Sequence, residues 1–162
     1  MFTPSQLQLA DAVLVRCRIH GIMLATAESC TGGLIAACLT AMTGSSAVVE
    51  RGFVTYTNQA KIEMLGVPAP VLEKMGAVSE EVAREMAEGT LRRAPVQAAI
   101  AVTGIAGPGG GSDAKPVGLV HIAAARSGQL TMHECHQFAG DRDTVRAAAL
   151  EASLRLLVRL LD

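Results

Sequence analysis

Hydrophobic positions along the chain follow two spacings, which predicts a fold of alternating helices and strands. A capping pattern over Thr3–Gln6, followed by apolar residues at helical spacing, predicts a first helix that ends at Gly21. Short apolar runs bounded by glycine or polar clusters predict strands over 22–27, 48–56 and 98–102. The pattern also predicts helices over 34–42, from Thr57 or Asn58 to Gly66, after 68–70, and from a cap at Ser79 through Arg93.

The last third of the chain predicts a hairpin followed by a helix. Two strand-like runs, 117–125 and 131–138, flank Ser127-Gly128. Because a hairpin pairs antiparallel strands, the sheet should be mixed, and we expect an α/β fold of about five strands in one domain over 1–162. Asp141 opens a final amphipathic helix whose expected buried side is Val145, Leu150, Leu154, Leu157 and Leu161.

Composition narrows the class of protein. Half of the residues are hydrophobic but only 2% are aromatic, so the core must be aliphatic. The net charge of -1 offers no field that would attract nucleic acid, and no apolar run reaches the roughly 18 residues of a membrane span. The four cysteines form no C-x-x-C pair, and Met1–Ala10 does not resemble an export signal. We therefore expect a soluble cytoplasmic protein with reduced thiols.

Two loops of small residues follow predicted strands. One reads Glu28-Ser29-Cys30-Thr31-Gly32-Gly33, and the other runs from Thr103 to Pro116. In open α/β sheets, ligands bind at the carboxyl ends of strands, where both loops should lie. The sequence therefore predicts a ligand site between them.

Ser29 is the candidate nucleophile in the first loop. A turn of small residues can expose its hydroxyl, while backbone N–H groups at the following helix start can hold a phosphate or an oxyanion. The turn is not a G-x-S-x-G elbow, because Ala27 and Thr31 occupy the glycine positions. A helix cap with tight packing would explain the same residues about equally well.

A serine nucleophile needs a base, and the sequence favours Lys61 over any histidine. The histidines at 20, 121, 133 and 136 have no evident pairing with Ser29. Strand alternation places His133 and Cys135 on one face and His136 on the other, which argues against a metal site. Lys61 lies one helical turn after Tyr56-Thr57-Asn58 and could act as a neutral amine in a dry pocket. Taken alone, a lysine at this position would usually be a solvated helix lysine.

The glycine-rich stretch 104–111 does not match a standard nucleotide-binding loop. The dinucleotide pattern fails because Ser112 stands where glycine is required, and the P-loop pattern fails because Pro116 follows Lys115. A flexible loop rich in N–H groups still suits a phosphate-bearing substrate, for which Arg142 could supply a bidentate fork. A plain surface position for Arg142 is equally compatible.

Taken together, the motifs resemble the CinA C-terminal domain family. The segments that carry the resemblance are 27–33, 44–46, 56–61, 76–79, 103–108, 115–118 and 138–142. The resemblance implies a three-layer α/β/α sandwich with a mixed, mostly parallel sheet. It also implies a nicotinamide mononucleotide amidohydrolase that needs no cofactor or metal, acts in pyridine nucleotide salvage, and takes the stand-alone form without a further N-terminal domain.

The resemblance also assigns roles to residues. Ser29 would be the nucleophile, Lys61 the base, and Tyr56 would stand beside them. N–H groups near Thr31 to Gly33 would stabilise the oxyanion. The residues expected to contact substrate are Cys30, Thr31, Gly32, Gly33, Ser45, Ser46, Thr103, Gly104 and Arg142.

Two alternatives stay open on the sequence. Cys30 could be the nucleophile, because a thiol at a helix start can have a lowered pKa. The domain could instead bind a nucleotide without turning it over. An apolar, alanine-rich surface would also suit a homodimer.

Overall fold

A five-stranded mixed sheet forms the centre of the protein. The computed structural model describes residues 2–162. The strands are β1 (Leu24–Glu28), β2 (Val49–Val54), β3 (Ala98–Gly104), β4 (Leu119–Arg126) and β5 (Met132–Gln137), in the spatial order β2-β1-β3-β4-β5. β1 pairs in parallel with β2 and β3, whereas β4 is antiparallel to β3 and β5. Four of the five strands therefore run in one direction, which confirms the prediction of a mixed, mostly parallel sheet.

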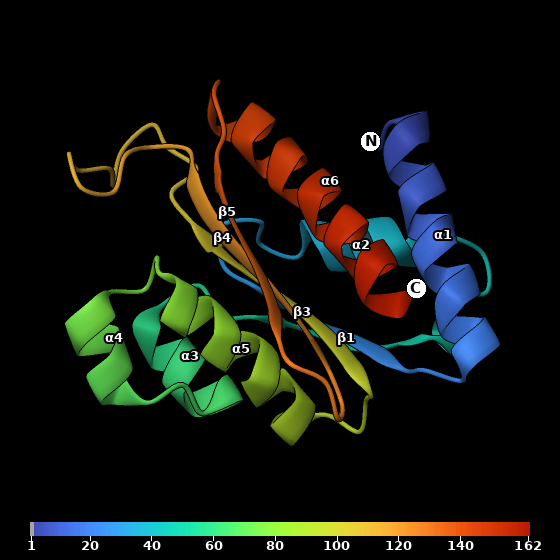
Figure 1. Ribbon diagram of the computed structural model, residues 1–162. Helices are drawn as coiled ribbons and strands as arrows, with labels where there is room; N and C mark the ends of the chain where they lie inside the picture. The colour runs from blue at the N-terminus through green and yellow to red at the C-terminus, as the bar shows by residue number, and fades with distance from the viewer. Residues whose placement is uncertain (1) are drawn as a thin grey trace.

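Helices cover both faces of the sheet, which confirms the three-layer α/β/α prediction (Figure 1). One layer holds α1 (Pro4–His20), α2 (Leu34–Thr40) and α6 (Arg142–Leu161). The other holds α3 (Asn58–Leu65), α4 (Ala69–Met75) and α5 (Glu80–Arg93). A short 3-10 helix, η1 (Ser45–Ala47), precedes β2.

The helix starts are set by local capping, as the sequence predicted. Thr3 and Gln6 form a reciprocal capping box on α1. The side chains of Thr57, Ser79 and Asp141 accept backbone N–H groups at the starts of α3, α5 and α6. The strands are placed correctly, but β2 is shorter at both ends than the predicted run over 48–56.

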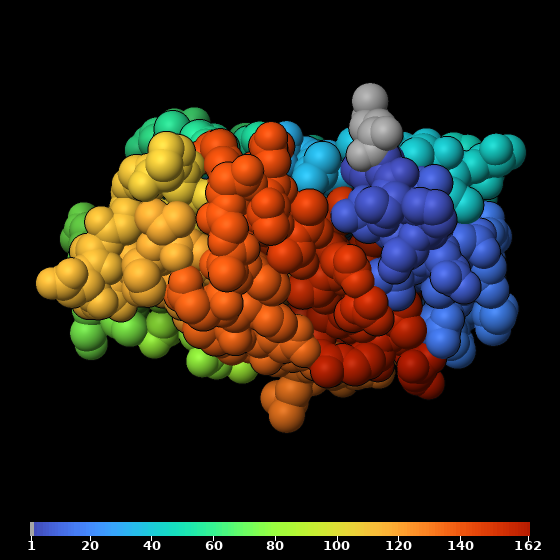
Figure 2. All heavy atoms as spheres, turned by 90° about the horizontal axis from the view of Figure 1, so that it is seen from above, coloured from blue at the N-terminus to red at the C-terminus, as the bar shows by residue number. Residues whose placement is uncertain are grey.

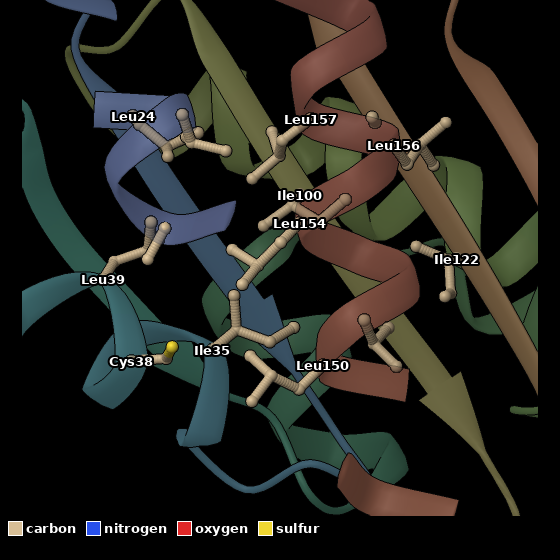
Figure 3. Close-up of a cluster of buried hydrophobic side chains, with 14 of the residues drawn as sticks. Leu24, Ile35, Cys38, Leu39, Ile100, Ile122, Leu150, Leu154, Leu156 and Leu157 are labelled. Carbon is tan, nitrogen blue, oxygen red and sulfur yellow. The ribbon is translucent and has the colours of Figure 1, made fainter. Parts of the chain in front are cut away.

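The core beneath α6 is aliphatic, as the composition required. Figure 3 shows leucines of α6 pointing towards Ile100 on β3 and Ile122 on β4. The expected inner side of α6 is buried: Val145, Leu150, Leu154, Leu157 and Leu161 are each 0–1% exposed. Burying one such side chain contributes roughly 1.5–3 kcal/mol, so this packing fixes where the first turn of α6 stands relative to the sheet.

The cysteines form no disulfide among the described residues. Cys17, Cys30, Cys38 and Cys135 are all free thiols, and the first three are buried. Across residues 2–162, no helix combines the length and apolar character that crossing a bilayer would take.

Candidate active site

Ser29 follows β1 at the carboxyl end of the sheet, where the sequence placed it. Its N–H donates to the carbonyl of Val102 on β3 at 3.0 Å, so the turn is tied to the neighbouring strand. The residue is 9% exposed, which leaves limited access to its side chain. The backbone that carries the Ser29 hydroxyl is therefore held in a fixed position at the end of the sheet.

Lys61 meets Ser29 in the interior. The Lys61 Nζ atom donates to Ser29 Oγ at 3.1 Å and to the Thr55 carbonyl at 2.7 Å. Lys61 is only 1% exposed, and desolvation lowers the pKa of its amine to about 8, against the smaller opposing effect that a charged Cys30 thiolate would have. An amine with that pKa is neutral in roughly a tenth of molecules at pH 7, and the neutral form can accept a proton.

Glu28 is a buried residue that the sequence analysis did not assign to any role. Its side chain is 0% exposed, and its carboxylate accepts the N–H groups of Gly33, Ile35 and Ala36 at 2.9–3.0 Å. Gly33 is the N-cap residue of α2 and has no side chain that could cap the helix. Glu28 therefore supplies the cap from the preceding strand and fixes α2 beneath the Ser29 turn.

The backbone of the turn changes the expected set of oxyanion donors. The Gly32 N–H donates to the Ser29 carbonyl at 3.0 Å, and the Gly33 N–H is taken by Glu28. Two of the three N–H groups expected to face an oxyanion, those of Thr31 to Gly33, are thus already occupied. Within residues 2–162, the N–H groups of Cys30 and Thr31 donate to no backbone carbonyl. The free donors begin one residue closer to Ser29 than predicted.

The tight geometry of this turn depends on glycine. Gly32 and Gly33 have φ values of 61° and 96°, in the left-handed region that side-chain-bearing residues rarely adopt. Two such residues in succession reverse the chain directly from β1 into α2. The small residues expected at 32 and 33 thus serve the backbone that places Ser29.

Arg142 joins three parts of the site. From the first turn of α6, its Nη1 donates to the Gly107 carbonyl at 2.8 Å and its Nη2 to the Tyr56 hydroxyl at 2.7 Å. Tyr56 is 57% exposed and, among the described residues, makes no hydrogen bond to Ser29 or Lys61. Arginine carries five N–H donors, so Arg142 keeps some for an anionic ligand.

A cavity of 210 Å³ lies between these elements. It is lined by Cys30, Tyr56, Gly104, Ile105, Ala106, Gly107, Gly109, Gly110 and Arg142. In Figure 2 the yellow atoms of the loop that follows β3 form one end of the molecule. Because Cys30 and residues of the glycine-rich loop line one cavity, the first small-residue turn and this loop converge as expected.

Thr103 contributes to the shape of the site rather than to its open surface. The residue is 1% exposed, and its hydroxyl donates to the Ala77 carbonyl at 2.8 Å. Lys115 Nζ donates to the Met75 carbonyl at 2.6 Å in the same region. The first bond ties the loop over 76–79 to the end of β3, and the second ties the end of α4 to the loop that follows β3.

Ser45 and Ser46, expected to contact substrate, lie away from Ser29 in this structure. The Val48 carbonyl accepts the N–H of Leu24, so the turn that precedes β2 lies at the amino end of β1. Gly44 in the same turn lies next to Arg18, near the end of α1. Ser29 lies beyond the opposite end of β1, roughly 15 Å away for a five-residue strand. The structure therefore does not bring these two serines together with Ser29 in the same chain.

The histidines stand apart from Ser29. His121 and His133 contact each other through ring nitrogens at 3.0 Å, and His136 contacts Glu134 at 2.8 Å. His133 and Cys135 both approach His121 while His136 does not, as strand alternation predicted. In the described part of the chain, no three His, Cys, Asp or Glu side chains gather as metal ligands would.

Comparison with known proteins identifies the family. The CinA C-terminal domain profile matches residues 6–161. The nicotinamide-nucleotide amidohydrolase PncC of Escherichia coli K12 is 49% identical over 158 residues, covering 96% of this chain and 94% of that protein. A CinA-like protein of Citrifermentans bemidjiense is 47% identical over 99% of this chain, which spans 39% of that longer relative.

Solved structures agree with the sequence matches. The crystal structure of competence/damage inducible protein CihA from Agrobacterium tumefaciens superposes with a TM-score of 0.98, at 47% identity and over 100% of this chain. A CinA superfamily structure from Escherichia coli gives a TM-score of 0.92 at 40% identity. With a profile match over nearly its whole length and close relatives by sequence and structure, the chain belongs to the CinA C-terminal domain family.

Proposed function

We propose that this protein is a nicotinamide-nucleotide amidohydrolase, which converts nicotinamide mononucleotide and water to nicotinic acid mononucleotide and ammonia in pyridine nucleotide salvage. The observation that carries the proposal is the buried contact of 3.1 Å between Lys61 Nζ and Ser29 Oγ. A relative 49% identical over most of the chain bears the name of this activity. The contact supplies a nucleophile and a base from the chain itself.

The first step forms an acyl-enzyme. Neutral Lys61 takes the hydroxyl proton of Ser29 as Oγ bonds to the carboxamide carbon, and the carbonyl oxygen becomes an oxyanion. The oxyanion is attached to the substrate carbon bonded to Ser29. The N–H groups of Cys30 and Thr31, which have no backbone acceptor, are the nearest such donors that follow Ser29 in the sequence. Lys61 then returns the proton to the amide nitrogen, the C–N bond breaks, and ammonia leaves.

The second step releases the acid. Lys61, neutral again, takes a proton from a water molecule as the water oxygen bonds to the acyl carbon. Collapse of this second tetrahedral intermediate breaks the bond to Ser29 Oγ, which recovers its proton from Lys61. The products are nicotinic acid mononucleotide and the regenerated enzyme, and all atoms of the substrate and water are accounted for.

The substrate would lie between the Ser29 turn and the glycine-rich loop. The 210 Å³ cavity beside Cys30 suits the pyridine ring and its carboxamide. Arg142 stands at the mouth of this cavity with donors to spare, so it would bind the phosphate, and Tyr56 would hold the guanidinium in place. The glycine loop would offer backbone N–H groups to the ribose phosphate.

The thiols and the sheet edges bear on where the protein acts and on whether it forms a dimer. Four free thiols, one of them exposed at Cys135, suit a reducing cytoplasm. β2 and β5 are the two edges of the sheet, and an edge strand can pair with another copy. We therefore propose a cytoplasmic homodimer that acts on a small nucleotide and has no nucleic acid partner.

Incubation of the purified chain with nicotinamide mononucleotide tests the function. We expect ammonia and nicotinic acid mononucleotide to appear in equal amounts, because breaking one C–N bond produces both. Ammonia is measured by an enzyme-coupled assay and the nucleotide by chromatography, with nicotinic acid mononucleotide as a control substrate that has no amide to lose. Tight binding by calorimetry with no ammonia after long incubation would instead make the protein a nucleotide-binding module.

Cys30 gives a second test, because its thiol is unsuited to be the nucleophile. Burial raises the pKa of this thiol to about 11, so almost none is thiolate at pH 7. We expect Cys30→Ala to keep ammonia release within about tenfold of wild type, since only packing at the cavity wall changes. We also expect iodoacetamide to modify the exposed Cys135 well before Cys30, as followed by peptide mass spectrometry. Rapid alkylation of Cys30 that substrate prevents would favour the cysteine nucleophile.

A further inference from the structure

Arg146 lies one turn after Arg142 on α6 and contacts the Ser29 turn from behind. Its Nη2 donates to the Thr31 carbonyl at 3.0 Å, which links α6 to the turn over 115 residues of sequence. The side chain is 29% exposed, and its Nε is buried without a hydrogen-bond partner among the described residues. The guanidinium is thus partly buried, with one N–H group bonded to the Ser29 turn and its Nε left without a partner.

The contact with Thr31 begins a short chain of peptide units that ends at Cys30. The Thr31 carbonyl and the Gly32 N–H belong to one planar peptide, and the Gly32 N–H donates to the Ser29 carbonyl at 3.0 Å. The Ser29 carbonyl and the Cys30 N–H belong to the next planar peptide. The Cys30 N–H donates to no backbone carbonyl in residues 2–162 and has only the sulfur of its own side chain nearby, so the chain ends on a donor without a backbone acceptor next to the nucleophile.

A cation at the first carbonyl affects the whole chain. A charge-assisted hydrogen bond to the Thr31 oxygen withdraws electron density from its peptide and makes the Gly32 N–H a stronger donor. The stronger bond to the Ser29 oxygen then polarises the second peptide in the same sense. The Cys30 N–H becomes more acidic and is also held more rigidly, both of which favour binding of an oxyanion.

We propose that Arg146 is a positioning residue that orients and polarises the Cys30 N–H as an oxyanion donor, acting through the peptides of Thr31 and Ser29. The proposal rests on the proposed function and deepens it. Arg146 itself touches no reacting atom, which distinguishes it from Arg142 at the cavity wall. The charge that faces it is Asp143, whose carboxylate lies 3.8 Å from Nη1 and is 91% exposed, so solvent screens this partner.

Three variants test the proposal. Arg146→Met keeps an unbranched apolar stem but removes the charge and its donors, Arg146→Lys keeps the charge but loses the planar fork, and Asp143→Asn is the control. For Arg146→Met we expect kcat to fall about tenfold or more while KM stays within about twofold, because the lost interaction acts on the transition state. We expect Arg146→Lys to lie between Arg146→Met and wild type, and Asp143→Asn to match wild type.

A spectroscopic readout separates polarisation from a purely structural effect. In two-dimensional amide spectra of the protein without substrate, we expect the Gly32 and Cys30 amide protons to move upfield in Arg146→Met and by less in Arg146→Lys. A fall in kcat with an unmoved Cys30 amide would overturn the proposal, as would a rise in KM at constant kcat. If Arg146→Met does not fold, Arg146→Lys decides by the same two criteria.

The same experiment distinguishes this proposal from the proposed function. Wild-type protein that releases no ammonia from nicotinamide mononucleotide would remove the function, whereas the amide resonances would still show whether Arg146 polarises the turn. Active wild-type protein with an Arg146→Met variant of unchanged kcat would remove the role of Arg146 alone.

Discussion

Replacing Ser29 with alanine is expected to lower ammonia release from nicotinamide mononucleotide by at least about a thousandfold, because the chain loses the atom that forms the acyl-enzyme. Lys61 lies 3.1 Å from Ser29 Oγ, so the variant keeps its base but has nothing for that base to activate. Substrate affinity should change little, since Arg142 and the glycine-rich loop remain. Single-turnover ammonia assays and calorimetry measure the two quantities separately.

The matched control is Ser127→Ala, which removes an exposed serine hydroxyl in the β4–β5 hairpin. It should leave both quantities within experimental error of wild type, because surface substitutions away from such features have small effects. Near-normal ammonia release by Ser29→Ala would mean that water attacks the amide directly or that another group forms the covalent intermediate. The catalytic scheme built on Ser29 would then fail, although the amidohydrolase activity itself would stand.

The parts of the fold that sequence reasoning predicted best are those set by neighbouring residues. Thr3 caps α1 through a contact with Gln6, and Ser79 and Asp141 cap their helices within three residues. The inner side of α6 follows from helical periodicity alone. Such interactions depend on the spacing of residues along the chain, so they can be recognised from the sequence alone.

The site was harder to predict because its decisive contacts join distant segments. Glu28 caps α2 from the end of β1, and the only sequence signal for this is a helix start at Gly33 that has no capping side chain. Ser45 and Ser46 are small polar residues like those expected to bind substrate, yet strand pairing places them at the opposite end of β1 from Ser29. The contact between Ser29 and Lys61 joins residues 32 positions apart, and nothing in the sequence between them shows that the two side chains meet in a buried place.

Burial of Lys61 has a cost in stability that accompanies its chemical use. A lysine that is 1% exposed gains two hydrogen bonds but loses hydration of its ammonium form, and desolvation therefore lowers its pKa to about 8. The same effect that prepares the amine to accept a proton makes the charged form unfavourable in the fold. Activity and stability should thus respond to the titration of one group.

Lys61→Met is expected to abolish ammonia release and to change how stability depends on pH. For wild type, kcat/KM should rise with pH, reach half of its limit near pH 8 and level off above it, because only the neutral form can accept the Ser29 proton. The variant has no amine at this position and should show a loss of about a thousandfold or more. Lys74→Met, at an exposed position on α4, serves as the control and should keep the wild-type profile.

The stability effect follows from the two pKa values of Lys61. Below pH 8 the amine is protonated both in the folded state and in the unfolded state, where its pKa is the ordinary 10.5, so the folded state bears the full desolvation cost. Between pH 8 and 10.5 the unfolded state holds a proton that the folded state has released, so wild-type stability rises with pH. Relative to Lys61→Met, this rise should total about 3 kcal/mol. Urea unfolding at several pH values from 7 to 10.5 measures it. The thiols of Cys17 and Cys38 titrate in both proteins and cancel, and carrying Cys30→Ala in both proteins removes the one buried thiol that is coupled to Lys61. A difference that stays constant over this range would mean that Lys61 titrates like a solvated lysine, and it could not then serve as the base near neutral pH.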